Sequence, residues 1–125
     1  MESDTYYTLA DCPFCAIVAG EEPATIVHEW PYALAIVPLE PVTEGHTLVL
    51  PKAHTKDFTT SMDGLLWAMV GAAKLARKMG GDVNLITSRG PAATQSVFHL
   101  HLHLVPRREG DGLALPWTTG QAVPA

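Results

Sequence analysis

Three histidines occupy every second position of one short segment. His99, His101 and His103 alternate with leucines in the stretch FHLHLHLVPRR, residues 98–108. Strict alternation is the period of a β-strand, in which every second side chain points to the same face. A rise of about 3.3 Å per residue would place neighbouring histidine Cα atoms roughly 6.6 Å apart. Such a row can hold a phosphate, bind a metal or perform acid–base chemistry near neutral pH.

The chain has two cysteines, Cys12 and Cys15, in a C-x-x-C spacing. They can be half of a zinc site completed by histidines, for which His54 and one histidine of the triad are available. They can instead be a redox dithiol of the thioredoxin kind, which needs a preceding strand, or two ordinary buried thiols. The spacing favours zinc and leaves the other two interpretations open.

The loop SRGPAATQS, residues 88–96, lies directly before the histidine segment. Gly90, Gln95, Ser96 and the backbone N–H groups of this loop could cradle an anion. Many loops of this composition bind nothing, so it is the position next to three histidines that makes this one a candidate.

Length and charge limit the class of protein. The 125 residues are 47% hydrophobic and predict a single domain over 1–125, with a core at 11–108 and an irregular tail at 109–125. The net charge of −5 argues against a nucleic-acid partner. No apolar run approaches the length of a membrane span, and the acidic N-terminus does not resemble a signal peptide. We therefore expect a cytoplasmic protein without a membrane partner.

Periodicity predicts an α+β fold with a mostly antiparallel sheet. Strands are expected at residues 25–30, 32–37, 46–51, 82–88 and 97–105. A short helical turn precedes them and ends at Gly20, and one long helix is expected at 62–79. The residues predicted to line the apolar face of that helix are Leu65, Leu66, Met69, Val70, Ala73 and Ala76.

Four motifs occur in an order that resembles the histidine triad (HIT) family of nucleotide hydrolases and transferases. They are HLHLHLV, EGHTLVLPKAH at 44–54, CPFCAIVAGEEPATIVHE at 12–29 and QSVFHLHLHLVPR at 95–107. The N-terminal motif is similar to that of the zinc-containing bacterial, Hint-like members. The resemblance covers about residues 11 to 108.

The resemblance implies a HIT-like fold with a five-stranded antiparallel sheet, one long helix and a short N-terminal helix. It also implies a homodimer in which the two sheets join. In the zinc-containing members, one structural Zn²⁺ per subunit is held by two cysteines and two histidines. The corresponding ligands are Cys12, Cys15, His54 and His99.

The resemblance further implies attack on the α-phosphorus of a nucleoside phosphoramidate, ester or anhydride, with purine derivatives preferred, through a nucleotidyl-histidine intermediate. His101 would be the nucleophile, His103 would hold the phosphate oxygens, and Ser96 would donate to the leaving group or a bridging oxygen. His99 would orient the site. His46 is expected to have a structural role and His28 an exposed one.

The residues expected to contact the nucleotide are Ser88, Gly90, Gln95, Ser96, His101, His103, Asn84, Ile36, Leu39, Phe14 and Ile17. The chain departs from the family pattern at three of its positions. Pro38 replaces an acidic or amide side chain that holds ribose hydroxyls, and Ser88 replaces an asparagine. Thr94 replaces a glycine, and threonine is costly there if the position needs a positive φ.

Other functions remain open at this stage. The ending LVPRR is similar to the dinucleoside polyphosphate hydrolase branch of the same family. A non-catalytic nucleotide-binding module is compatible with Pro38 and Thr94. A zinc hydrolase that uses the triad itself as ligands would place the metal at His101 and His103 with an open coordination position.

Overall fold

The computed structural model describes residues 8–118. The elements in chain order are α1 (Pro13–Val18), β1 (Ile26–Glu29), β2 (Ala33–Ile36), β3 (Thr47–Pro51), α2 (Met62–Met79), β4 (Asp82–Ile86), a 3-10 turn (Pro91–Ala93) and β5 (Leu102–Arg107). The five strands form one antiparallel sheet in the order β1-β2-β3-β5-β4. The predicted α+β architecture is confirmed. Residues 109–118 contain no helix or strand, and the part of the predicted tail at 119–125 lies outside the described residues.

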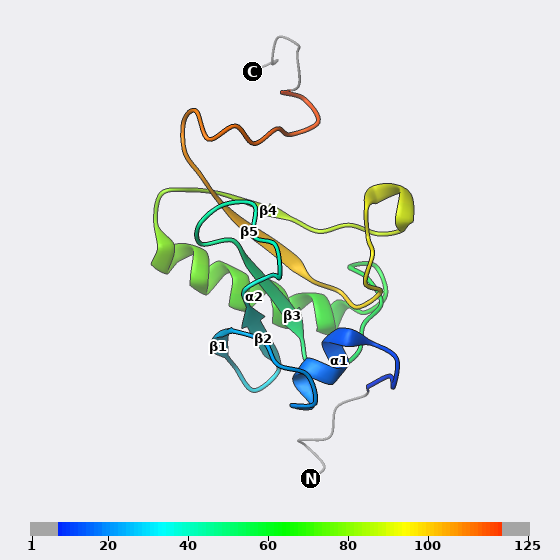
Figure 1. Cartoon of the computed structure of the whole chain (residues 1–125). Coiled ribbons are helices and arrows are strands. Elements are labelled where there is room, and N and C mark those ends of the chain that lie inside the picture. The colour runs from blue at the N-terminus through cyan, green and yellow to red at the C-terminus, as the bar shows by residue number, and fades with distance from the viewer. Residues whose placement is uncertain (1–7, 119–125) are drawn as a thin grey trace.

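The sheet carries one apolar cluster on each face, and each cluster is covered by one helix (Figure 1). Under α2 lie Ala35, Val49, Leu100, Leu102 and Leu104, together with Ala68 and Ala72 of the helix. On the opposite face Leu34, Ile36, Leu48 and Leu50 pack against Phe14, Ile17 and Val18 of α1 and its end. This second face carries the candidate site.

The helix α2 has the bounds that the sequence predicts, and its end residues explain them. The hydroxyl of Ser61 accepts from the backbone N–H of Gly64 at 3.3 Å, which caps the N-terminus. At the other end Gly80 has a φ of 70°, a conformation that favours glycine. No helix within residues 8–118 is long and apolar enough to cross a membrane.

The prediction for the apolar face of α2 is right only in part: Leu65 and Ala76 pack against the apolar cluster, but the other four predicted residues are exposed. Small residues face the sheet, namely Gly64, Ala68, Gly71 and Ala72, whereas Leu66, Met69 and Val70 are exposed. The reason is the short distance between helix and sheet: a Cβ built on Gly71 would lie 2.9 Å from the ring of Trp30. Apolar periodicity identifies large side chains, and here three of the predicted ones, Leu66, Met69 and Val70, are exposed.

The predicted start of the histidine strand is also wrong. β5 begins at Leu102, so His99 and His101 precede it and only His103 lies within it. The backbone before β5 forms hydrogen bonds outside the sheet. The N–H of Leu100 donates to the carbonyl of Thr55 at 2.6 Å, and the carbonyl of His101 accepts from the hydroxyl of Thr87 at 2.9 Å. The alternation itself persists, since the three intervening leucines are all buried in the α2 cluster.

Candidate functional site

Four side chains converge beside α1 into a cluster with the composition of a zinc site. The cluster consists of Cys12, Cys15, His54 and His99, whose ligand atoms all lie within 4.8 Å of one another. The Sγ of Cys15 lies 3.3 Å from Nδ1 of His54 and 3.6 Å from Nδ1 of His99. Zinc–sulfur and zinc–nitrogen bonds in a tetrahedron would separate such donors by about 3.6 Å. The residues therefore fit a four-coordinate ion.

Backbone contacts and burial give the donors of this cluster the protonation states that suit a cation. Nε2 of His99 donates to the carbonyl of Pro51 at 2.8 Å, which leaves the lone pair on Nδ1 facing the sulfurs. Burial lowers the pKa of His99 to about 4, so this ring is neutral at pH 7. Burial raises the pKa of Cys15 to about 11, and a bound cation is what would stabilise its thiolate.

The middle histidine is held by its neighbour's backbone. Nδ1 of His101 lies 2.7 Å from the carbonyl of His99, and because a carbonyl only accepts, Nδ1 carries the proton. The lone pair is therefore on Nε2, which contacts no hydrogen-bond partner among residues 8–118. No buried nitrogen in that range lacks a partner, so solvent reaches this atom. Phe14 packs edge-on against the ring at 5.1 Å.

His103 borders a cavity of about 300 Å³ on the same face of the sheet. It lies in a lateral row with Leu48 of β3 and Ile86 of β4. The polar residues around the cavity are His46, Asn84, Ser88, Thr94, His103 and Arg107. Its apolar residues are Val42, Ile86, Val105 and the segment 113–115 that follows β5.

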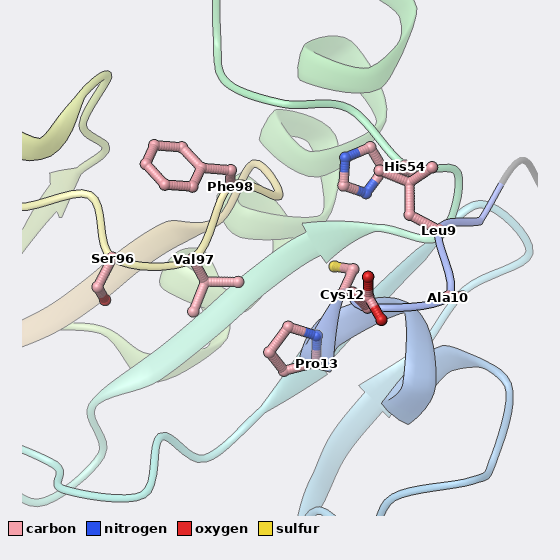
Figure 2. A pocket seen from close by; sticks show the side chains of 9 residues that line it. Leu9, Ala10, Cys12, Pro13, His54, Ser96, Val97 and Phe98 are labelled. Carbon is pink, nitrogen blue, oxygen red and sulfur yellow. The ribbon is translucent and has the colours of Figure 1, made fainter.

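A second cavity, of about 410 Å³, borders the metal cluster. Figure 2 shows Ser96, Val97 and Phe98 on one side of it and Leu9 on the other. Its labelled lining is completed by Ala10, Cys12, Pro13 and His54. The two cavities thus divide the predicted catalytic set, because Ser96 borders one and His103 the other.

The loop 88–96 is held from within. Gln95 is buried; its Oε1 accepts from the backbone N–H of Gly90, and its Nε2 donates to the carbonyls of Lys56 and Val97. Thr94 has a φ of 71°, which is the left-handed conformation that the glycine pattern suggests. Threonine therefore occupies a left-handed position in this loop.

A comparison with family models matches the HIT domain over residues 19–110. The chain belongs to the HIT family. An uncharacterized HIT-like protein of Mycobacterium tuberculosis is 44% identical over 110 residues, which cover 83% of this chain and 76% of that protein. The adenosine 5'-monophosphoramidase of Saccharomyces cerevisiae is 38% identical over 111 residues, covering 86% of this HIT protein and 70% of the yeast one.

A solved structure supports the same assignment. The zinc-bound histidine triad family protein of Mycobacterium smegmatis superposes on this HIT protein with a TM-score of 0.76. The two are 42% identical, and the match covers 83% of this chain and 80% of that one.

The structure brings only some of the predicted nucleotide contacts together in this HIT protein. Phe14 and Ile17 pack against the cluster that contains Ile36, beside the triad. Leu39 is fully exposed and contributes to neither cavity. Asn84 borders the His103 cavity, but its Oδ1 accepts from Nη1 of Arg107 at 2.6 Å.

Sequence reasoning missed Arg107 and the segment that it holds. Its guanidinium pairs with Asp111 at 2.8 Å and donates to the carbonyl of Leu113, which fixes the chain that borders the His103 cavity. An arginine four residues before an aspartate is a visible sequence signal, but nothing in it says that the pair lies outside a helix. His46 was assigned a structural role, and the structure places its ring 3.0 Å from His103.

Proposed function

We propose that this HIT protein cleaves nucleoside phosphoramidates, esters or anhydrides at the α-phosphorus through a nucleotidyl-His101 intermediate. The observation that carries the proposal is the fixed tautomer of His101. Its Nδ1–H is bound by the carbonyl of His99, and its Nε2 lone pair is open to solvent. A neutral imidazole in this state attacks phosphorus without a separate base. The name of the yeast relative supports a phosphoramidate as the first substrate to test.

The proposed reaction has two displacements. Nε2 of His101 forms a bond to the α-phosphorus, and the bond from phosphorus to the leaving nitrogen or oxygen breaks with its electron pair. Solvent supplies the proton of the departing amine or alcohol, and the hydroxyl of Ser96 donates a hydrogen bond to it. Water then attacks the same phosphorus and releases one proton to solvent, the phosphorus–nitrogen bond to His101 breaks with its electron pair returning to Nε2, and a nucleoside monophosphate leaves.

The test is mass spectrometry of the protein mixed with adenosine phosphoramidate. We expect a transient adenylyl adduct on His101 and release of AMP. In His101→Asn the adduct should vanish and turnover should fall at least ~10³-fold, because covalent catalysis is lost. Binding of AMP should fall far less, since His103 and the loop 88–96 remain. AMP binding without an adduct or turnover in the wild-type protein would instead indicate the non-catalytic module.

We also propose one structural zinc per subunit at Cys12, Cys15, His54 and His99. Within residues 8–118 this is the single group of three or more donors that could hold a metal. His101 and His103 use their Nδ1 atoms for a carbonyl and for His46. Neither of them belongs to that donor group, which argues against a zinc hydrolase that uses the triad as ligands. Within residues 8–118 no strand precedes the cysteines, which argues against a thioredoxin-like redox role.

We propose, finally, that a second copy of the chain covers the outer face of α2. Four apolar side chains of the helix are exposed there, namely Met62, Leu66, Met69 and Val70. The strand β4 is an edge of the sheet and exposes Leu85 and Ile86. Exposed apolar side chains next to an open strand edge are typical of an interface between subunits.

A further inference from the structure

His46 lies directly behind the third histidine of the triad. Its Nε2 is 3.0 Å from Nδ1 of His103, although the two residues are 57 positions apart in the chain. His46 is buried, with 5% of its surface exposed. The contact joins the residue before β3 to the second residue of β5, on the face of the sheet that carries the site.

A backbone group determines which nitrogen of His46 carries the proton. The N–H of Val42 lies 3.1 Å from Nδ1 of His46. Because a peptide N–H can only donate, Nδ1 must accept and cannot be protonated. His46 is therefore neutral with its proton on Nε2, in agreement with the lowering of its pKa by burial.

The proton on His46 in turn determines the state of His103. Since Nε2–H of His46 donates, Nδ1 of His103 accepts, and the proton of His103 resides on its Nε2. That Nε2 has no hydrogen-bond partner among residues 8–118 and is open to solvent. The ring borders the 300 Å³ cavity, so an N–H group is presented there. Burial and the neighbouring imidazoles of His101 and His46 lower the pKa of His103 to about 4, which keeps the ring neutral.

We propose that His46 is a positioning residue that locks His103 in the Nε2–H tautomer and so makes it a hydrogen-bond donor to substrate. His101, two residues earlier, is locked in the opposite tautomer because its Nδ1 meets a carbonyl instead of an imidazole N–H. One ring then offers a lone pair to phosphorus, and the next offers a proton to a phosphoryl oxygen. The opposite tautomer of His103 would point a lone pair at an anionic oxygen and repel it. The donor role towards phosphate rests on the proposed function, whereas the tautomer does not.

The decisive measurement is the ¹⁵N chemical shifts of the histidine rings by NMR in the zinc-loaded protein at pH 7. We expect His103 to carry its proton on Nε2 and His101 on Nδ1. In His46→Leu, which keeps bulk but has no donor, the Nε2–H population of His103 should fall. In His46→Gln, whose side-chain amide can still donate, the wild-type tautomer should persist. The exposed His28, changed to Leu, serves as the matched control and should leave both rings unaltered.

Turnover of adenosine phosphoramidate provides the second readout. We expect kcat to fall about tenfold or more in His46→Leu, because a charge-stabilising donor is weakened, and to recover largely in His46→Gln. A wild-type His103 protonated on Nδ1 would overturn the proposal, as would an unchanged tautomer in His46→Leu. If His46→Leu does not fold, the wild-type spectrum and the glutamine variant still decide. Correct tautomers in a protein that turns over no phosphoramidate would refute the proposed function and leave the tautomer assignment intact.

Discussion

Thr94 is the single residue other than glycine with a positive φ among residues 8–118. A side chain in this left-handed conformation costs roughly 1–2 kcal/mol, because the Cβ crowds the following carbonyl. Thr94 ends the 3-10 turn of the loop and borders the cavity that contains His103. The strain is therefore stored beside the proposed phosphate site.

Thr94→Gly should stabilise the protein by about 0.5–1 kcal/mol. The gain is smaller than the relieved strain because glycine loses more backbone entropy on folding. Urea denaturation of the two proteins measures the difference. Thr94→Ala is the control: it keeps the left-handed cost and should give no gain. Equal stabilisation by both changes would show that the backbone conformation is not the cause.

At the residue scale, the sequence indicates which side chains are candidates for chemistry, but it does not indicate which of their ring nitrogens carry protons. Spacing and residue type indicate the triad, but they leave three interpretations of the cysteines open, and the four candidate metal ligands follow from the resemblance to the HIT family. The tautomers of His101 and His103 depend on the carbonyl of His99 and, through His46, on the N–H of Val42. Such backbone partners follow from the tertiary fold, so they cannot be recognised in the amino-acid sequence.

At the scale of elements, α2 approaches the sheet through its smallest residues. Gly64 lies against Thr55 and Gly71 against Trp30, with no room for a Cβ at either contact. The bounds of α2 were predictable because Ser61 caps its N-terminus and Gly80 ends its C-terminus, and both effects depend only on local sequence. The buried face was predictable at Leu65 and Ala76 but not at its small residues Gly64, Ala68, Gly71 and Ala72, which the close approach of helix and sheet selects.

Gly71→Ala should destabilise the protein by about 1–3 kcal/mol, since the added Cβ would press on the Trp30 ring. The sign of this stability change is informative, because glycine-to-alanine at an exposed helix position stabilises a protein by up to ~1 kcal/mol. Chemical denaturation measures it. Trp30 also packs against His28 at 4.6 Å, which limits its freedom to move aside. A stabilising result would mean that the Trp30 ring moves aside to make room for the added methyl group.

Cys12→Ser should remove the metal and lower the free energy of unfolding by at least ~2 kcal/mol, because binding energy at a structural zinc site is folding energy. Turnover by the remaining folded protein should change less, since His101 does not contact the metal donors through its Nε2. Metal analysis and thermal melting give the two readouts, with Asp11→Asn as a neighbouring non-ligand control. Wild-type protein purified without chelator and free of zinc would contradict the site.

The segment after β5 should depend on pH through Asp111. The guanidinium of Arg107 and the backbone N–H groups of Arg108 and Leu113 hold the pKa of this carboxyl well below its ordinary value of 3.8. Its charge therefore stabilises the fold at and above pH 3.8, and this contribution is lost as the pH falls further. Asp111→Asn should be less stable than wild type at pH 7, and the difference should shrink below pH 4. Denaturation curves across pH test this, and a difference that does not vary with pH would argue against it.

At the scale of the whole molecule, the apolar stripe on α2 and the open edge of β4 predict self-association. Leu66→Glu should convert a dimer into a monomer, because it places a charge within the proposed interface. Leu66 is 59% exposed, so the subunit fold should survive. Light scattering at micromolar concentration measures the mass, and Lys78→Glu near the end of the helix serves as the control. If the wild-type protein is a monomer, the proposal that a second copy covers the outer face of α2 is wrong.

The donors of the metal cluster come from widely separated parts of the chain. Cys12 and His99 are 87 positions apart, and His54 stands between them. On a ribosome that adds about 5–20 residues per second, the fourth donor is made roughly 4–17 s after the first. During that interval a nascent chain can offer zinc only an incomplete set of ligands. If zinc binds there as proposed, full coordination is a late event in biosynthesis, and metal content would report which chains have brought the segment before β5 into place.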